Sequence, residues 1–167
     1  MLASTLFMAY VSCNFKKVDH QIKTLSPKIE IAYKHRLINA VCASAEKHGV
    51  PVEVLVALLH VESGFRLGAV NSKTNDFGIA QVNEFNIKAF GINKKLLLTD
   101  LEYSIDKGAM ILSWFHRTYS KRESMWYARY NVGTRKLRGA LLKIYNRYGK
   151  KIQWRVRVYE TYKRIQK

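Results

Sequence analysis

The sequence has few residues of the kinds that break or cross-link a chain. It holds only two prolines and two cysteines among 167 residues, and it has no Gly/Ser-rich tract, repeat or low-complexity segment. A composition that is 48% apolar and 25% charged is typical of a globular protein and excludes a disordered chain. The length suits one domain with a hydrophobic core.

The two cysteines are too few to define a metal site. Cys42 lies among small residues of a helical pattern, whereas Cys13 lies beside the N-terminal apolar stretch. Nothing in the sequence supports a bond between them, so we expect a buried free thiol at Cys42. The five histidines are scattered without ligand spacing, so we expect no zinc site and no cofactor.

Acidic residues are scarce. The chain has 12 Asp and Glu against 29 Lys and Arg, a net charge of +17. Such a surplus attracts nucleic acid, anionic lipid or the anionic bacterial envelope. In residues 135–167 twelve basic residues accompany a single acid. The aromatic residues interleaved among them have helical spacing, which indicates that their rings face a core. We therefore favour a solvated basic face that is attracted to the anionic bacterial envelope over a nucleic-acid-binding surface.

The apolar N-terminal stretch, residues 1–13, is too short to span a bilayer, which takes about 20 residues. It also lacks the positive residues that begin an export signal. A degenerate export signal, a membrane-surface anchor and a packed N-terminal segment all stay open. We assign residues 1–26 to an apolar leader and linker, and residues 27–167 to one domain.

Helical spacing dominates the rest of the chain. It predicts a helix over 29–48 that ends at Gly49, and a helix over 52–63 that is apolar nearly all round and therefore buried. The polar stretch over 64–78 predicts a loop or small hairpin. Further helices are predicted over 78–83, 85–90, 101–119, 123–129, 135–147 and 151–165. The fold class is mainly α.

Glu62 ends an apolar stripe on the second of these helices. Leu55, Leu58, Leu59 and Glu62 have the spacing i, i+3, i+4, i+7, which places them on one face. Desolvation disfavours the anion, and the last turn of a helix repels negative charge, so we predict a raised pKa. A glutamic acid protonated near neutral pH suits the general acid of glycoside cleavage. The alternative is a glutamate that turns into solvent.

Three short motifs stand in order along the chain: ESGF at 62–65, GIAQ at 78–81 and ARYNVG at 128–133. Together they resemble the lytic transglycosylase domain of the lysozyme superfamily, over about residues 35 to 165. The resemblance implies a lysozyme-like fold and cleavage of peptidoglycan between N-acetylmuramic acid and N-acetylglucosamine. It also implies that Glu62 is the single catalytic acid/base.

The resemblance further implies the residues that bind the substrate. Gln81 is expected to reach it from a helix lining the groove. Tyr130 and Asn131 are expected beside Glu62, where they fix its orientation. A substrate-contacting serine of the family falls on Asn71 or on Ser72, depending on the motif from which it is counted, and we favour Ser72.

Other residues near the motifs have structural interpretations or depart from the family pattern. Ser63 is expected to support the backbone, and Asp76 to stabilise the loop after Glu62. Ala80 replaces the methionine that is usual in the family, which removes an apolar wall from the groove. No second carboxylate lies in a recognisable motif.

The function implied is a peptidoglycan lytic transglycosylase of the bacterial periplasm or envelope, exported or delivered by a phage. Such an enzyme opens the wall locally for a secretion or conjugation machine, or for phage genome entry. Its partners would be glycan strands, proteins of those machines or particles, and a membrane surface through residues 1–13. Two alternatives stay open: a hydrolytic muramidase of goose-lysozyme type, and a non-catalytic basic component of a virion or secretion complex.

Overall fold

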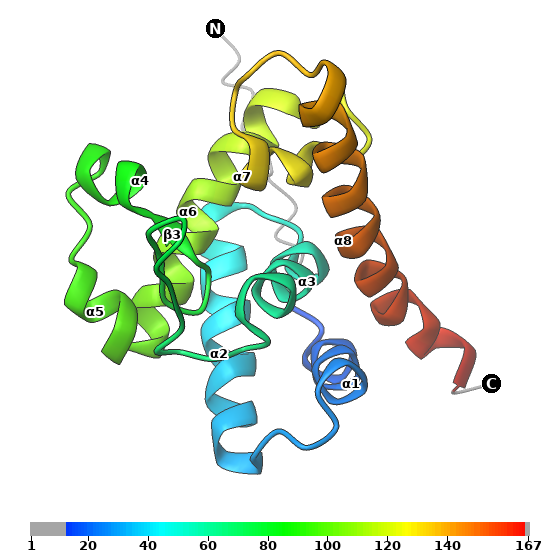
Figure 1. Ribbon diagram of the computed structural model, residues 1–167. Helices are drawn as coiled ribbons and strands as arrows, with labels where there is room; N and C mark the ends of the chain where they lie inside the picture. The colour runs from blue at the N-terminus through cyan, green and yellow to red at the C-terminus, as the bar shows by residue number, and fades with distance from the viewer. Residues whose placement is uncertain (1–12, 166–167) are drawn as a thin grey trace, which may run out of the picture.

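The structure is a computed structural model that describes residues 13–165 (Figure 1). The apolar leader expected at the N-terminus therefore lies almost wholly outside the described residues, and its export or membrane role stays a prediction. Within the described part of the chain, no helix combines the length and the apolar character needed to cross a membrane.

Helices make up most of the described chain. The helices and strands, in chain order, are α1 (Phe15–Leu25), α2 (Ile31–His48), α3 (Val52–Ser63), β1 (Val70–Asn71), β2 (Asp76–Phe77), β3 (Val82–Asn83), α4 (Glu84–Ala89), α5 (Lys94–Thr99), α6 (Leu101–Tyr119), the 3₁₀-helix η1 (Trp126–Ala128), α7 (Arg129–Val132) and α8 (Gly139–Ile165). The mainly α class and the helices predicted over 29–48, 52–63, 85–90 and 101–119 are confirmed. Helix α5 was not predicted.

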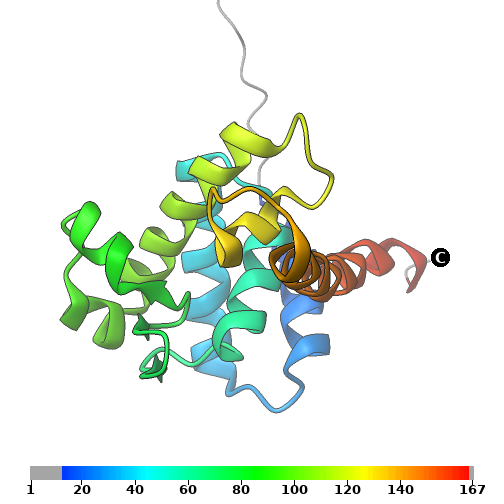
Figure 2. The same ribbon diagram turned by 45° about the horizontal axis from the view of Figure 1, so that its top comes forward.

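The helix α3 forms the centre of the molecule. It packs against α1, α2 and α8, and six consecutive residues from Val54 to Leu59 are buried. A helix buried nearly all round must be apolar on every side, as the sequence of α3 is. Figures 1 and 2 show α8 on one side of α3, and α4, α5 and the strands on the other.

The segment between α3 and α4 folds into a small antiparallel sheet in the order β1-β2-β3. Strands β1 and β2 form the small hairpin predicted over 64–78, and β3 extends it to three strands. The helix predicted over 78–83 is wrong. Gly78 and Gln81 have φ angles of 79° and 48°, in the left-handed region that a right-handed helix cannot contain. Gly78 cannot be replaced without a shift, because a Cβ there would lie 2.4 Å from the carbonyl oxygen of Leu97.

The C-terminal helices predicted over 135–147 and 151–165 are one continuous helix, α8. Gly149 lies within it, where a glycine normally weakens a helix. Its missing side chain has a packing role, since a Cβ at this position would lie 2.7 Å from the sulfur of Met125. The helix predicted over 123–129 is likewise corrected: a turn precedes η1 and the short α7.

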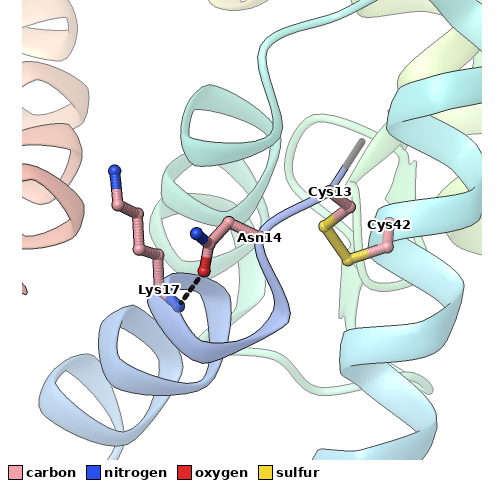
Figure 3. The surroundings of a disulfide bond; sticks show 4 residues. All are labelled: Cys13, Asn14, Lys17 and Cys42. Carbon is pink, nitrogen blue, oxygen red and sulfur yellow. Dashed lines mark hydrogen bonds between the residues drawn. A yellow bond between two sulfur atoms is a disulfide. The ribbon is translucent and has the colours of Figure 1, made fainter. Parts of the chain in front are cut away.

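The first described residues belong to the packed body. Residues assigned to the leader and linker form α1, in which Val18, Gln21 and Ile22 have no exposed surface. This helix is capped by Asn14, whose side chain accepts a hydrogen bond from the amide of Lys17 (Figure 3).

A disulfide joins Cys13 to Cys42 of α2 (Figure 3). The expected free thiol at Cys42 is therefore wrong. The physical reason is that α1 folds back along α2 and brings the two Cα atoms within 5.5 Å, a separation that suits a disulfide. The sequence could not place Cys13 because α1 was not predicted.

Candidate active site

Glu62 lies in the last turn of α3, two residues before the glycine that ends the helix. Gly64 has a φ angle of 63°, which terminates α3 and turns the chain towards the sheet. The side chain of Glu62 is half-buried, and the hydroxyl of Tyr148, on α8, donates a hydrogen bond to its Oε1. The glutamate therefore joins the central helix to the C-terminal one.

The acidity of Glu62 matches the sequence prediction. Burial raises its pKa from 4.5 to about 7, the hydrogen bond from Tyr148 opposes the rise, and the negative charge of Asp76 adds to it. Desolvation dominates because an anion loses its hydration when the carboxyl is shielded from water. At neutral pH this carboxyl is close to half protonated, so it can both donate and accept a proton.

Tyr130 and Asn131 lie on α7, the short helix that precedes α8 in the chain. The hydroxyl of Tyr130 donates to the carbonyl oxygen of Ala80 over 3.0 Å. Burial, followed by the charges of Glu62 and Asp76, raises the pKa of Tyr130 far above its usual value, so the ring lies near Glu62 and stays neutral. Asn131 is exposed.

The turn before β3 carries Gln81. Its side-chain amide donates to the carbonyl oxygens of Ala69 (3.1 Å) and Gly78 (2.9 Å), and these hydrogen bonds stabilise the loop. Gln81 therefore lies in a turn and not in the expected helix. Ala80 has no exposed surface. It packs against Gly108 of α6, where an added Cβ would lie 2.4 Å from the Cβ of Ala80. The small side chain of Ala80 therefore lets the turn pack closely on α6, and it does not line a groove.

The two candidates for the substrate-contacting serine position are both exposed. Asn71 lies in β1, where its side chain accepts a hydrogen bond from the amide of Lys73. Ser72 lies in the turn between β1 and β2. Both belong to the sheet that follows Glu62, and their contact with substrate stays a prediction.

Two polar residues near Glu62 stabilise the backbone. Ser63 donates to the carbonyl oxygen of Ile79 over 2.7 Å and accepts from the amide of Arg66, so it connects the end of α3 to the turn before β3. Asp76 accepts hydrogen bonds from Thr74 and from Asn83, the latter over 2.7 Å. These contacts agree with the structural roles expected of Ser63 and Asp76.

Comparison with known proteins identifies the domain. Residues 39–153 match the family described as the transglycosylase SLT domain. The chain belongs to the transglycosylase SLT domain family. This membership confirms the resemblance drawn from the three motifs and, with the helical structure, the lysozyme-like fold class. The family is one of enzymes, the lytic transglycosylases.

Two relatives of this transglycosylase domain are similar over much of their length. The chain is 34% identical to invasion protein IagB of Salmonella typhimurium over 130 residues, which cover 72% of this chain and 74% of IagB. It is 32% identical to protein IpgF of Shigella flexneri over 99 residues, or 54% of this chain. That match spans 63% of IpgF, less than two thirds of its length.

The residue that sequence reasoning missed in this transglycosylase domain is Tyr148. It appeared only as one of the aromatic residues with core spacing near the C-terminus. Its ring is indeed buried, but its hydroxyl is the group that holds Glu62. A signal was present, because a tyrosine in a core stripe needs a partner for its hydroxyl and Glu62 needed a donor.

A second polar cluster holds α7, the short helix that carries Tyr130. Arg129 donates through Nε to Glu123 over 2.9 Å and through Nη1 to the carbonyl oxygen of Arg135 over 2.8 Å. Tyr145 of α8 donates to the same Glu123. We name Glu123, Arg129 and Tyr145 the Glu123 cluster; it fixes α7 against α8.

Metal ligation has no support in the described part of the chain. No group of three or more His, Cys, Asp or Glu residues there comes together in a way that could hold an ion. His60, two residues before Glu62, accepts a hydrogen bond from Arg155 over 2.7 Å. Burial, followed by the Arg155 charge, lowers its pKa, so His60 is a neutral packing residue.

Proposed function

We propose that this protein is a peptidoglycan lytic transglycosylase that uses Glu62 as its single acid/base. The observation that carries the proposal is the half-buried Glu62 carboxyl with a pKa of about 7. Glycosidases that work with two carboxylates need a nucleophile or base opposite the acid. Asp76 is the acidic residue whose charge acts on Glu62. Its carboxylate accepts hydrogen bonds from Thr74 and Asn83 within the sheet, so we assign it a structural role and not that of a second catalytic carboxylate.

A single acid suffices when the substrate supplies the second group. The Glu62 carboxyl gives its proton to the glycosidic oxygen as the bond from C1 of N-acetylmuramic acid breaks. The 2-acetamido oxygen of the same sugar stabilises the positive charge at C1. Proton transfer of this kind contributes about 10²–10⁴-fold in rate.

The second step uses the carboxylate that the first step leaves. Glu62 takes the proton of the 6-hydroxyl of N-acetylmuramic acid, and the 6-oxygen bonds to C1 to close a 1,6-anhydro ring. No water is consumed, and Glu62 ends in its starting state. A pKa near neutrality serves both steps, because the group must lose and regain the proton with comparable ease.

The neighbours of Glu62 orient it and the sugar. Tyr148 fixes one carboxyl oxygen, which directs the other towards the substrate. We assign Gln81, Tyr130, Asn131 and Ser72 to substrate binding, with Tyr130 also supporting the turn through Ala80.

We place the enzyme in the periplasm or envelope, where it would open the wall for a secretion or conjugation machine or for phage genome entry. The disulfide between Cys13 and Cys42 supports an oxidising compartment, since such bonds are rare in the cytosol. A relative named an invasion protein favours the machine over the phage particle.

The experiment is mass spectrometry of the fragments released from purified sacculi by the full chain and by Glu62→Gln. We expect anhydro-muramic ends from the wild type and none from the variant. Reducing muramic ends, heavier by one water, would instead identify a hydrolytic muramidase. Clearing of sacculi that is unchanged in Glu62→Gln would contradict the role of Glu62, and no clearing by the wild type would leave the non-catalytic alternative.

A further inference from the structure

A closed set of hydrogen bonds connects α1, α3 and α8. The Nε of Arg155 on α8 donates to Nδ1 of His60 on α3 over 2.7 Å. On the other side of the same ring, Nε2 of His60 lies 3.1 Å from the carbonyl oxygen of Leu25, the last residue of α1. Gln21 of α1 closes the set, because its side-chain amide donates to the carbonyl oxygen of Arg155 over 3.0 Å. We name Gln21, Leu25, His60 and Arg155 the three-helix circuit.

The partners of His60 determine which of its ring nitrogens carries the proton. A carbonyl oxygen only accepts, so Nε2 donates to Leu25; a guanidinium only donates, so Nδ1 accepts from Arg155. The imidazole is therefore neutral, and each nitrogen bonds a different helix. This arrangement ties α3 to both α1 and α8 at a residue two positions before Glu62.

Gln21 is a polar residue at a position where packing alone would favour an apolar one. Its side chain has no exposed surface, and its Oε1 has no hydrogen-bond partner among the described residues. An unpaired buried acceptor destabilises the native state. The amide group of the same side chain donates to the carbonyl oxygens of Glu53 on α3 and of Arg155 on α8, both over 3.0 Å. The role of Gln21 is therefore to connect these helices.

The circuit lies on the same two helices as the hydrogen bond from Tyr148 to Glu62. Arg155 follows Tyr148 by seven residues, two turns of α8, so both side chains leave the helix on the same side. They bond to α3 at His60 and at Glu62. A single contact lets one helix pivot on another, whereas two contacts about 10 Å apart along α8 fix its direction.

Helix α1 adds this connection from outside the matched domain. The family match covers residues 39–153, so α1 and Arg155 both lie beyond it. Helix α1 packs against α2, α3 and α8 (Figure 1), and the disulfide between Cys13 and Cys42 fixes its beginning to α2. Because α1 is anchored in this way, it can hold α3 and α8 in one arrangement.

We propose that the three-helix circuit positions the Tyr148 hydroxyl against the Glu62 carboxyl. Gln21 and Arg155 are then positioning residues that act on Glu62 through Tyr148. This inference rests on the proposed function, in which Glu62 is the acid, and adds the part of the fold that sets its acidity. When the circuit opens, α8 pivots and the hydroxyl moves away. The pKa of Glu62 then rises, because the hydrogen bond from Tyr148 lowers it.

The test measures the titration midpoint of the Glu62 carboxyl by NMR and the alkaline limb of kcat/KM for fragment release from sacculi, both in the full chain. Gln21→Leu removes the buried amide without a change of charge. Arg155→Met removes the guanidinium and keeps an unbranched side chain. Arg157→Met is the matched control, since it makes the same change at an exposed position two residues further along α8. Each variant is also combined with Tyr148→Phe.

We expect Gln21→Leu and Arg155→Met each to raise the midpoint and the alkaline limb by about half a pH unit, in the direction expected of Tyr148→Phe. In the Tyr148→Phe background neither should raise them further, because the hydrogen bond through which they act is already absent. Arg157→Met should leave both in place.

An unchanged midpoint in folded Gln21→Leu and Arg155→Met proteins would overturn the proposal and leave the circuit a purely structural contact. A rise that persists in full in the Tyr148→Phe background, or that Arg157→Met reproduces, would overturn it in favour of a direct effect of charge. A lowered midpoint would overturn it in favour of water entering the site.

Two features keep these outcomes decisive. If Gln21→Leu does not fold, Arg155→Met decides alone, because the side chain of Arg155 is partly exposed and its removal leaves no buried gap. Failure of the proposed function appears separately, as missing anhydro ends in the wild type, and the NMR midpoint of Glu62 still tests the circuit in that case.

Discussion

Two glutamates of this molecule accept hydrogen bonds from tyrosines of the same helix, yet their acidities move in opposite directions. Tyr148 donates to Glu62, and Tyr145, one turn earlier on α8, donates to Glu123 over 3.0 Å. The pKa of Glu62 is raised to about 7, whereas the pKa of Glu123 is lowered.

The two sites differ in which influence on the carboxyl is largest: desolvation at Glu62, and a neighbouring cation at Glu123. The hydrogen bonds from Arg129 are the main reason for the low pKa of Glu123. Among the described residues no lysine or arginine forms a salt bridge with Glu62, and the charge that acts on it is that of Asp76. A tyrosine alone does not keep a desolvated carboxyl ionised, and an arginine does. The guanidinium of Arg129 therefore favours the ionised form of Glu123, whereas desolvation favours the protonated form of Glu62.

The largest effects should come from neutralising each glutamate in turn. Glu62→Gln should lower the cleavage rate by about 10²–10⁴-fold, because the proton donor is lost, while the domain stays folded. Glu123→Gln should instead lower the free energy of unfolding by about 3 kcal/mol, because Arg129 loses its carboxylate partner.

Both variants are measured by fragment release from sacculi and by urea unfolding. Glu62→Asp serves as a matched control that keeps the acid but shortens it. A Glu123→Gln protein that is as stable as the wild type, or a Glu62→Gln protein that is as active, would remove the contrast between the two sites.

The pH dependence of stability should carry the signature of Glu62. Its folded pKa of about 7 lies above its ordinary value of 4.5, so the native state keeps the proton longer than the unfolded chain. The contribution is present below pH 4.5 and is lost as the pH rises through about 7. Glu62→Gln removes this loss, so its stability relative to the wild type should rise by about 3 kcal/mol over that window.

Urea unfolding of the two proteins at several pH values measures this difference. Glu123→Gln is the comparison, since the lowered pKa of Glu123 places its transition on the acid side. A stability difference between wild type and Glu62→Gln that does not change with pH would contradict the raised pKa.

Exchanging the tyrosines should sharpen the comparison at a smaller scale. Tyr148→Phe removes the hydrogen bond that lowers the pKa of Glu62, so the alkaline limb of kcat/KM should move up by about one pH unit. Tyr145→Phe should leave that limb in place and lower the free energy of unfolding by about 1 kcal/mol. The pH profiles of fragment release test the pair, and an alkaline limb that moves down in Tyr148→Phe would reverse the assigned role.

The smallest effect should come from Asp76. Its charge raises the pKa of Glu62, so Asp76→Asn should lower the alkaline limb of kcat/KM by less than about one unit. Asparagine keeps the shape of the side chain and can still accept the hydrogen bond from Asn83. Complete loss of activity in a folded Asp76→Asn protein would instead make Asp76 a second catalytic carboxylate.

Local sequence patterns predicted the helices that the reaction depends on. The stripe that ends at Glu62 predicted both the buried face of α3 and the raised pKa, because an apolar stripe marks the face of a helix that the rest of the protein will shield from water. Helical spacing over 101–119 likewise predicted α6. Both predictions depend on patterns within one stretch of the sequence.

Contacts between distant segments were beyond the same reasoning. Tyr148 meets Glu62 across 86 residues, and Cys13 meets Cys42 across 29. Each pairing depends on how helices pack, and α1 and the continuity of α8 were not predicted. The turn at residues 78–81 was misread as helix because it packs against α5 and α6 through Gly78 and Ala80, contacts that the local sequence does not reveal.

The most direct test is a titration of the glutamate side-chain carboxyls by NMR, in ¹³C-labelled full-length protein, with Glu62→Gln and Glu123→Gln used to assign the two signals. We expect a midpoint of about 7 for Glu62 and one below 4.5 for Glu123. A Glu62 midpoint at or below 4.5 would mean that the carboxyl is ionised in the resting enzyme and cannot be the proton donor.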